Sequence, residues 1–263
     1  MMRKVVAAGW ISQIAIPIAA FVAMWQLAAM AIANPATLPT PAHVFSLAIE
    51  FSLQPGPRGY TAIYHLERTF LRVLIATVIA LSLSVVFGIL MWRSETVEAV
   101  LSDWLPFWMT IPTVILILIC MILFQFSTMS VIVAVLVAAT PFGIVNLWEG
   151  MKSVDTGLLE MTAAFDASSF QVWKDVYVPH LSPYIFGTFR YILGMVWKIV
   201  ALAEVFGIQS GIGSMFRYWY SQGRIDALLA YLLVFVLVML TIEYGVLKPV
   251  EWRTFKWRDS NVS

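Results

Sequence analysis

Long apolar stretches alternate with short polar segments along most of this chain. The apolar stretches cover residues 10–33, 70–92, 104–125, 128–148, 184–206 and 227–247. The hydrocarbon core of a bilayer is about 30 Å thick, and a helix needs roughly 20 apolar residues to cross it. The pattern therefore predicts an all-α polytopic membrane protein, with six transmembrane helices in a single domain.

Two of these stretches need separate arguments. Residues 104–148 contain no Asp, Glu, Lys or Arg, and the polar tip at residues 125–128 allows this long run to fold back as a hairpin of two crossings. Residues 10–33 follow the basic pair Arg3 and Lys4, and an apolar stretch after basic residues is also typical of a signal peptide. Because the apolar part is longer than the usual 7–15 residues or so of such a peptide, we expect a retained helix.

Composition excludes several other classes of protein. Hydrophobic residues make up 61% of the 263 and charged residues 12%, which is too little charge to cover a water-soluble domain. A net charge of +1 argues against a nucleic-acid partner, and the single cysteine, Cys120, excludes a disulfide framework. His43, His65 and His180 are scattered without metal-ligand spacing. We find no paired catalytic groups, so we do not expect an enzyme or a cofactor in this chain.

The basic residues near the chain ends predict the orientation in the membrane. They are Arg3, Lys4, Lys248, Arg253, Lys256 and Arg258. Six crossings place both ends on one side, and an excess of basic residues marks the cytoplasmic side. We therefore expect both termini, and with them the polar segment 152–183, to be cytoplasmic.

The polar segment 152–183 is predicted to form two short helices. Asp155 or Thr156 can cap the first helix. Its apolar side is formed by Leu158, Met161, Thr162 and Phe165. A break is expected at Asp166, after which Ser168 and Gln171 form a capping box for a second helix.

The second helix carries aromatic side chains along one side, at Phe170, Trp173 and Tyr177. Pro179 and Pro183 are expected to end it before the next span. Two short helices joined by a tight bend form a rigid knob that can transmit force from a soluble partner. A plain interfacial helix pair that packs on lipid headgroups has the same pattern.

A spaced motif runs through this segment, with Glu160, Asp166, Val176, Val178 and Pro179 separated by five, nine, one and no residues. It resembles the signature of the inner-membrane permease subunits of binding-protein-dependent ABC importers. That signature reads Glu-Ala-Ala, three residues, Gly, nine residues, an aliphatic residue, any residue and Leu-Pro. This chain departs from it where Met161 and Thr162 replace the two alanines and where Asp166 replaces the glycine. Since Asp tolerates left-handed backbone better than most residues, we expect the bend to survive.

Shorter matches in the same order extend the resemblance, toward the nitrate, sulfonate, taurine and bicarbonate branch of the family. They are Leu38-Pro39-Thr40-Pro41, His65 with Thr69 and Arg72-Val73, Val154-Asp155, Pro183, Arg190, Ala203-Glu204, and Gly211-Ile212-Gly213. Each match is weak alone, and the ordered set is specific.

The resemblance implies a type I ABC importer permease-like fold in the bacterial inner membrane. It implies three kinds of partner: cytoplasmic ABC ATPases that bind the ATP, a periplasmic or lipid-anchored substrate-binding protein, and a second permease subunit, with a homodimer preferred. The absence of a G-x-x-x-x-G-K-[ST] loop fits a separate ATPase. The residues implied in ATPase coupling are Glu160, Met161, Thr162, Ala163, Ala164, Phe165, Asp166 and Pro179. The implied substrate is a small anion such as sulfonate, nitrate, taurine or bicarbonate, with a vitamin-like heterocycle as the alternative.

The fifth apolar stretch suggests residues of the translocation path. Arg190, Trp197 and Glu204 recur at seven-residue steps on one helix face, and Lys198 lies near mid-span. A central charge costs about 2.5–3.5 kcal/mol on insertion scales, so it usually faces a cavity or a partner group. Lys198 either gives the path a positive potential suited to an anion or pairs with Glu204 or a backbone carbonyl. An ATP-independent secondary transporter and a membrane scaffold remain alternatives to the importer subunit.

Overall fold

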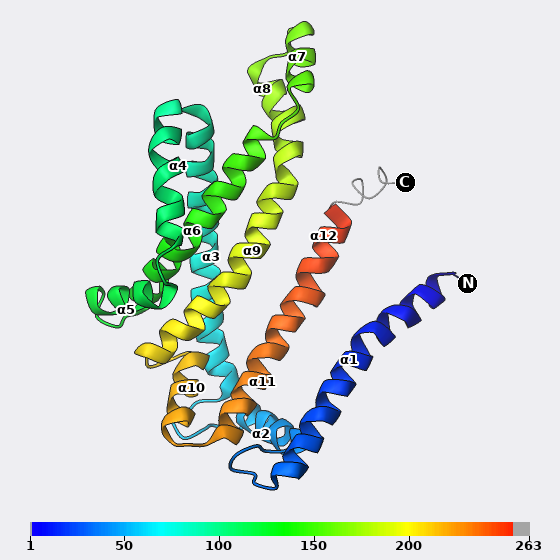
Figure 1. Cartoon of the computed structure of the whole chain (residues 1–263), viewed down its shortest axis with the longest axis vertical. Helices are drawn as coiled ribbons and strands as arrows, with labels where there is room; N and C mark the ends of the chain where they lie inside the picture. Colours follow the sequence, from blue (N-terminus) through cyan, green and yellow to red (C-terminus); the bar gives the residue numbers. More distant parts are fainter. Residues whose placement is uncertain (1, 255–263) are drawn as a thin grey trace. The chain divides into compact units, whose positions relative to one another are not determined.

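The computed structural model describes residues 2–254, with side chains for 16–252, and this part of the chain is helical without strands (Figure 1). The elements are α1 Met2–Ile32, α2 Pro41–Leu53, α3 Ala62–Arg93, α4 Glu95–Met109, α5 Thr113–Leu123, α6 Thr128–Lys152, α7 Thr156–Ala164, α8 Ser169–Val172, the π-helix η1 Trp173–Tyr177, α9 Val178–Phe206, α10 Ile212–Ser221, α11 Ile225–Ile242, the π-helix η2 Glu243–Leu247 and α12 Lys248–Thr254. The predicted all-helical fold class is confirmed.

Four helical stretches in the described part of the chain are long and apolar enough to cross a membrane. They are Ala62–Arg93, Thr128–Lys152, Ser169–Phe206 and Ile225–Trp252. The first predicted stretch falls in α1, whose described side chains begin at Ile16. The basic side chains of Arg3, Lys4, Arg253, Lys256 and Arg258, which predicted the orientation, lie outside the described residues.

The predicted span 104–125 differs from the structure. It is divided between α4 and α5, which are bent by 96° at a short break. Thr110 ends α4, and Pro112 stands at the N-cap of α5. A proline has no backbone N–H to continue a helix and disfavours helical backbone in the residue before it, so the chain turns here.

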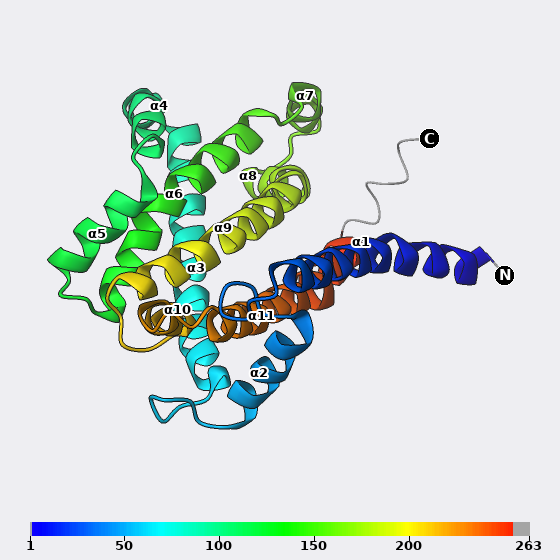
Figure 2. The same cartoon turned by 60° about the horizontal axis from the view of Figure 1, so that its bottom comes forward.

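The chain divides into two compact units, residues 1–65 with 215–238 and residues 66–214 with 239–263. In the second unit α6 and α9 pack along each other, as both views show (Figures 1 and 2). Gly143 of α6 allows this close packing, because a Cβ there would meet the side chains of Ser84 on α3 and Ile192 on α9. Small residues permit such approach where lipid supplies no hydrophobic driving force between helices.

The first unit is held by packing between α2 and α11. Val44, Ala48 and Ala230 form its buried core. Phe51 stacks on Trp219 and contacts Tyr231, with ring centroids 5.5 and 5.3 Å apart. Thr40 caps α2 by accepting a hydrogen bond from the backbone N–H of His43, and Pro41 occupies the first turn, where its missing N–H is not needed.

Candidate functional site

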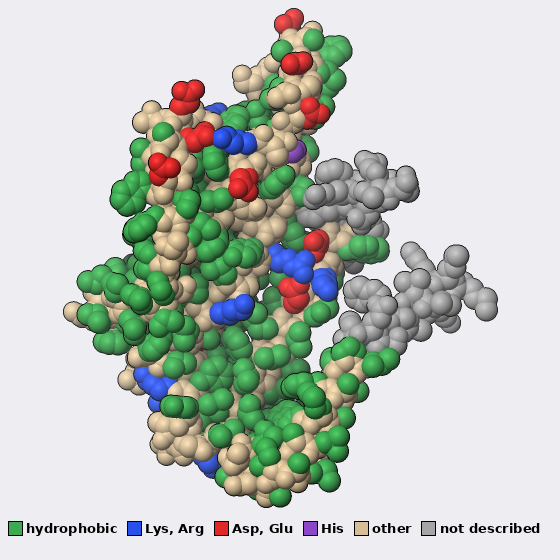
Figure 3. Space-filling view, viewed as in Figure 1, with side chains coloured by type: hydrophobic (Ala, Val, Ile, Leu, Met, Phe, Trp, Pro, Cys, Tyr) green, Lys and Arg blue, Asp and Glu red, His purple; other side chains and the backbone are tan. Residues whose placement is uncertain are grey.

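The polar segment after α6 contains α7, which is capped at its N-terminus as predicted. The side chain of Asp155 accepts a hydrogen bond from the backbone N–H of Gly157 at 2.8 Å. No residue of α7 is buried, and Glu160 is among its exposed side chains. In Figure 3 several acidic side chains lie over α4 and α7, and others lie beside basic side chains over α12. The helix is therefore stabilised locally by its cap, and Leu159 packs against the buried cluster of Met151, Val154, Tyr177 and Leu181 while most of its other side chains are exposed.

The bend predicted at Asp166 is present and has a defined geometry. Asp166 has φ +49°, in the left-handed region. Its backbone N–H donates to the carbonyl of Ala163, and that of Ala167 donates to the carbonyl of Thr162, at 3.2 and 3.0 Å. These two bonds form a Schellman motif, whose left-handed position is usually a glycine. The requirement for left-handed backbone explains why the family pattern has glycine here and why Asp is tolerated.

The face of α7 carries large apolar side chains that the chain leaves uncovered. Phe165 is 80% exposed and Met161 51% exposed. Phe170, at the start of α8, is 74% exposed. Exposed apolar side chains of this size are typical of surfaces that contact a membrane or a partner protein. The segment presents such a surface on a helix that is fixed at both ends.

An aromatic cluster anchors this segment to the spans. Trp92 at the end of α3 packs edge-on against Trp173 and Tyr177, with ring centroids 5.9 and 5.0 Å away. Tyr177 is buried with Met151, Val154 and Leu181. Trp173 and Tyr177 thus face Trp92 from one side of the second helix. Phe170 was predicted on the same side, but it points away from the cluster.

The prediction that Pro179 and Pro183 end the second helix is wrong. Residues Ser169–Phe206 form one continuous helix that includes both prolines. The capping box of Ser168 and Gln171 at its start is confirmed. The π-helix η1 lies directly before Pro179 and widens the helix where the proline ring would meet the carbonyl of the preceding turn. The anchored segment therefore continues into α9 without a break.

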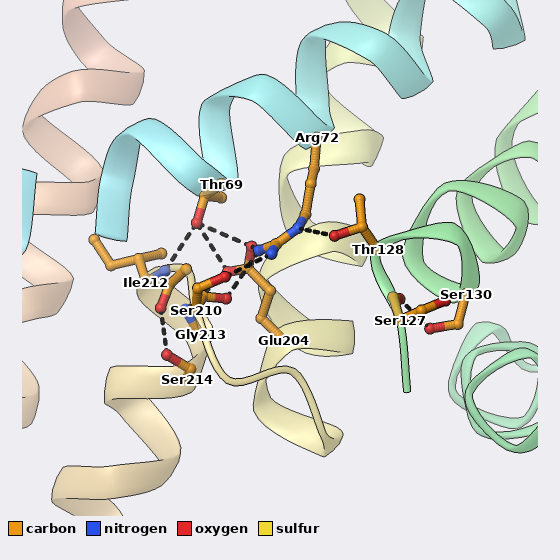
Figure 4. Close-up of polar contacts among 11 residues, drawn as sticks. Thr69, Arg72, Ser127, Thr128, Ser130, Glu204, Ser210, Ile212, Gly213 and Ser214 are labelled. Atoms are coloured by element: carbon orange, nitrogen blue, oxygen red, sulfur yellow. Dashed lines mark hydrogen bonds and ion pairs between the residues drawn. The ribbon is translucent and has the colours of Figure 1, made fainter. Parts of the chain in front are cut away.

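A buried polar network joins α3, α9 and the turn before α10 (Figure 4). Arg72 Nη1 donates to Glu204 Oε1 at 2.6 Å and to the carbonyl of Ser210 at 2.8 Å. Arg72 Nη2 donates to Ser210 Oγ at 2.7 Å, and Thr69 Oγ1 donates to Glu204 Oε2 at 2.8 Å. Glu204 is fully buried. The carboxylate is compensated by one guanidinium and one hydroxyl in the same site.

The network also holds the backbone of the Gly211–Gly213 turn. The N–H of Ile212 donates to Thr69 Oγ1 at 2.8 Å, and that of Gly213 donates to Glu204 Oε2 at 3.0 Å. Gly211 has φ +105°, and a Cβ on it would meet the Glu204 carboxylate. Glycine is required here both by the backbone conformation and by the close approach of the carboxylate. The turn is therefore fixed to α3 and α9 by hydrogen bonds that no other residue type at Gly211 would preserve.

The structure separates the four residues predicted in the translocation path. Trp197 and Glu204 are buried inside the unit, Trp197 in ring contact with Phe70. Arg190 pairs with Glu243 and, at 2.6 Å, with Glu251. Lys198 is exposed, and Glu204 binds Arg72, so the expected pair of Lys198 with Glu204 does not form. Of the four residues, only Lys198 stands on an open face of α9.

Sequence reasoning missed Thr69, Arg72 and Ser210 as site residues. Thr69 and Arg72 lie in one of the short matches to the importer family, and Glu204, Gly211 and Gly213 lie in another. These fragments are far apart in the sequence and meet in one buried network. The sequence signal that could have identified them is that all of them match the same family. Within the described residues, no group of three or more His, Cys, Asp or Glu is placed to hold a metal ion.

Comparison with known proteins agrees with this geometry. A family model described as "Binding-protein-dependent transport system inner membrane component" matches residues 80–244. The chain belongs to this family. It is thus a membrane-spanning permease of the binding-protein-dependent transport type, and the predicted family is confirmed.

Relatives cover nearly the whole chain. An ABC transporter permease protein of Methanocaldococcus jannaschii is 28% identical over 90% of this chain and 88% of its own length. An aliphatic sulfonates transport permease of Bacillus subtilis is 25% identical over 96% and 89%. A formylaminopyrimidine transport permease of Halalkalibacterium halodurans is 27% identical over 89% and 91%.

The fold of this permease matches a solved importer. A chain of the MetNI methionine ABC transporter, in an inward-facing crystal form, aligns with a TM-score of 0.56 at 20% identity, over 72% of this chain and 97% of that chain. This likeness supports the type I ABC importer permease fold.

Proposed function

We propose that this chain is the translocating subunit of an ATP-driven importer and that a separate ABC ATPase docks on α7. The observation that carries the proposal is the construction of the polar segment. Its exposed helix is capped by Asp155, bent at Asp166 and anchored to α3 through Trp92. A force applied to Glu160 or Phe165 therefore reaches the continuous helix Ser169–Phe206 through the hydrogen-bonded bend at Asp166 rather than through a loose loop.

The proposed assembly has the α7 side in the cytoplasm, together with both termini. A second permease subunit, preferably an identical copy, completes the path, and a substrate-binding protein delivers the solute on the other side. The lipid bilayer surrounds the spans. Family membership supports each of these partners. Among the relatives, one is named for aliphatic sulfonates and another for formylaminopyrimidine, so we propose a small organic solute as the substrate.

The docking surface is proposed to comprise Glu160, Met161, Thr162, Ala163, Ala164, Phe165 and Asp166. Pro179 is placed differently, because it lies on the continuous helix after η1 and not on α7. We propose that it contributes to coupling by setting the helix geometry behind the aromatic cluster rather than by touching the ATPase.

The test is affinity purification of the tagged full-length chain from its own membranes in mild detergent, with identification of the proteins that co-elute. We expect an ABC ATPase in the wild-type eluate and its loss from Glu160→Ala and Phe165→Ala. Glu95→Ala is the matched control, because Glu95 is an exposed acid in the first turn of α4. An eluate without ATPase, under conditions where a known importer keeps its own, would favour the secondary transporter or scaffold instead.

A further inference from the structure

A cavity of about 410 Å³ lies between the end of α4, α6 and α9 in the second unit. Its walls include the rings of Phe142 and Tyr191, whose centroids are 5.9 Å apart. Ligand sites for small molecules begin at roughly this size and combine aromatic walls with a few convergent polar groups. The cavity has both features.

The polar groups of the described cavity lining include a carboxylate and no cation. Asn146 Nδ2 donates to Thr188 Oγ1 at 2.5 Å, which leaves the Asn146 Oδ1 atom as an acceptor. Glu149 adds a carboxylate, and its neighbour Lys152 binds Glu98 instead, at 2.5 Å. No Lys or Arg is among the described residues that line the cavity. A sulfonate or nitrate ion, which offers acceptors only, would meet a like charge and find no cationic partner there.

A glycine keeps one wall of the cavity open. A Cβ built on Gly187 has no atom within 4 Å, so packing within the chain does not require a glycine at this position. A side chain at Gly187 would instead occupy the cavity it lines. The cavity is therefore open at Gly187, where a larger side chain would reduce its volume.

Lys198 is an exposed cation on the helix that carries Tyr191. It follows Tyr191 by seven residues on the same face of α9, which is roughly 10 Å along the helix. It does not line the cavity. The positive charge of Lys198, which suggested an anion path, is therefore not part of the cavity lining that holds the Glu149 carboxylate.

We propose that this cavity is a substrate subsite for a planar, amino-substituted nitrogen heterocycle that is neutral or cationic. Phe142 and Tyr191 are tilted by 47°, so one ring stacks on the flat face of the heterocycle and the other contacts its edge. Asn146 and Glu149 accept hydrogen bonds from its amino group and ring N–H. The inference rests on the proposed function and specifies its substrate class. It selects the vitamin-like heterocycle, which was the alternative expectation, over the small anion.

The test measures equilibrium binding of tritiated 4-amino-2-methylpyrimidine and tritiated ethanesulfonate to the purified, nucleotide-free permease–ATPase complex in lipid nanodiscs. We expect the pyrimidine to bind at least about tenfold more tightly than ethanesulfonate, because it alone donates to Glu149 and Asn146. Gly187→Ala and Gly187→Leu should weaken pyrimidine binding progressively, since they fill the cavity by increasing amounts. Glu149→Gln keeps the side-chain shape and should weaken it about fivefold to tenfold through loss of a charged acceptor.

Asp103→Asn is the control for Glu149→Gln, because Asp103 is an exposed acid of α4 outside the cavity. It should leave pyrimidine binding unchanged. Equal or tighter binding of ethanesulfonate, no measurable pyrimidine binding at millimolar concentration, or binding insensitive to both Gly187→Leu and Glu149→Gln would each overturn the subsite. Failure of the proposed function is a different result, namely that no ATPase purifies with the chain.

Discussion

Arg72 on α3 and Glu204 on α9 form an ion pair of 2.6 Å between two nearly fully buried side chains, 132 residues apart in sequence. Burial of a charge in a spanning segment is costly unless a partner and further hydrogen bonds compensate it. The Thr69 hydroxyl and the N–H group of Gly213 donate to the carboxylate and complete that compensation, and the N–H group of Ile212 donates to Thr69. The pair thus determines how α3, α9 and the turn before α10 are joined.

Loss of one partner of this pair should be strongly destabilising. Arg72→Met leaves the Glu204 carboxylate buried without its cation, and breaking such a pair costs about 3–5 kcal/mol. We expect a large fall in the free energy of unfolding, measured by denaturant titration of the detergent-purified chain. Glu98→Gln is the control, because its pair with Lys152 is partly exposed and worth about 1 kcal/mol or less. Equal effects of the two substitutions would contradict a structural role for the buried pair.

Gly211→Ala should destabilise the turn before α10 for two reasons. Left-handed backbone costs a residue with a Cβ about 1–2 kcal/mol, and the new methyl group would displace the Glu204 carboxylate. Gly59→Ala separates the two effects, because Gly59 has φ +78° but no atom within 4 Å of its Cβ position. We expect the thermal midpoint to fall more for Gly211→Ala than for Gly59→Ala. Identical shifts would mean that the approach of Glu204 adds nothing.

Asp166→Gly should strengthen the bend after α7. Glycine adopts the left-handed conformation without the penalty paid by other residues, so a gain of up to about 1 kcal/mol is expected for the bend. Asp166→Val should weaken it, because a β-branched residue is strained at positive φ. Hydrogen exchange of the Asp166 and Ala167 amides, which donate to Ala163 and Thr162, measures the change directly. Slower exchange in Asp166→Val than in the wild type would refute this account.

Trp92→Ala should detach the polar segment from the spans while leaving its own caps intact. Removal of a large aromatic side chain from a core costs about 3–5 kcal/mol, and somewhat less here because Trp92 is only partly buried. We expect faster proteolysis of the segment around α7 and weaker retention of the ATPase. Trp104→Ala is the matched control, since Trp104 is 59% exposed on α4. Unchanged proteolysis in Trp92→Ala would show that the anchor lies elsewhere.

Much of the fold follows from local sequence patterns. The apolar stretches predict spans because a bilayer demands a fixed helix length, and the cap at Asp155, the bend at Asp166 and the capping box at Ser168 depend on residues within four positions. The error at Pro179 has a physical cause. A proline normally ends a helix, but the π-helix before it makes room for its ring, and sequence alone gave no sign of that widening.

Local sequence patterns did not determine which side chains pair with one another in the spans. Helical periodicity placed Arg190, Trp197 and Glu204 on one face, and it was unable to decide whether that face meets solvent, a partner or another helix of the same chain. Tertiary packing decided it by bringing Arg72 to Glu204 and Glu243 to Arg190. The sequence by itself determined the family, the all-helical fold class and the local caps, because these depend on hydrophobic length and short-range hydrogen bonding. Only the tertiary structure decided which charged side chains are paired and which are exposed, as Lys198 and Glu149 are. The reason is that pairing depends on contacts between segments far apart in the chain.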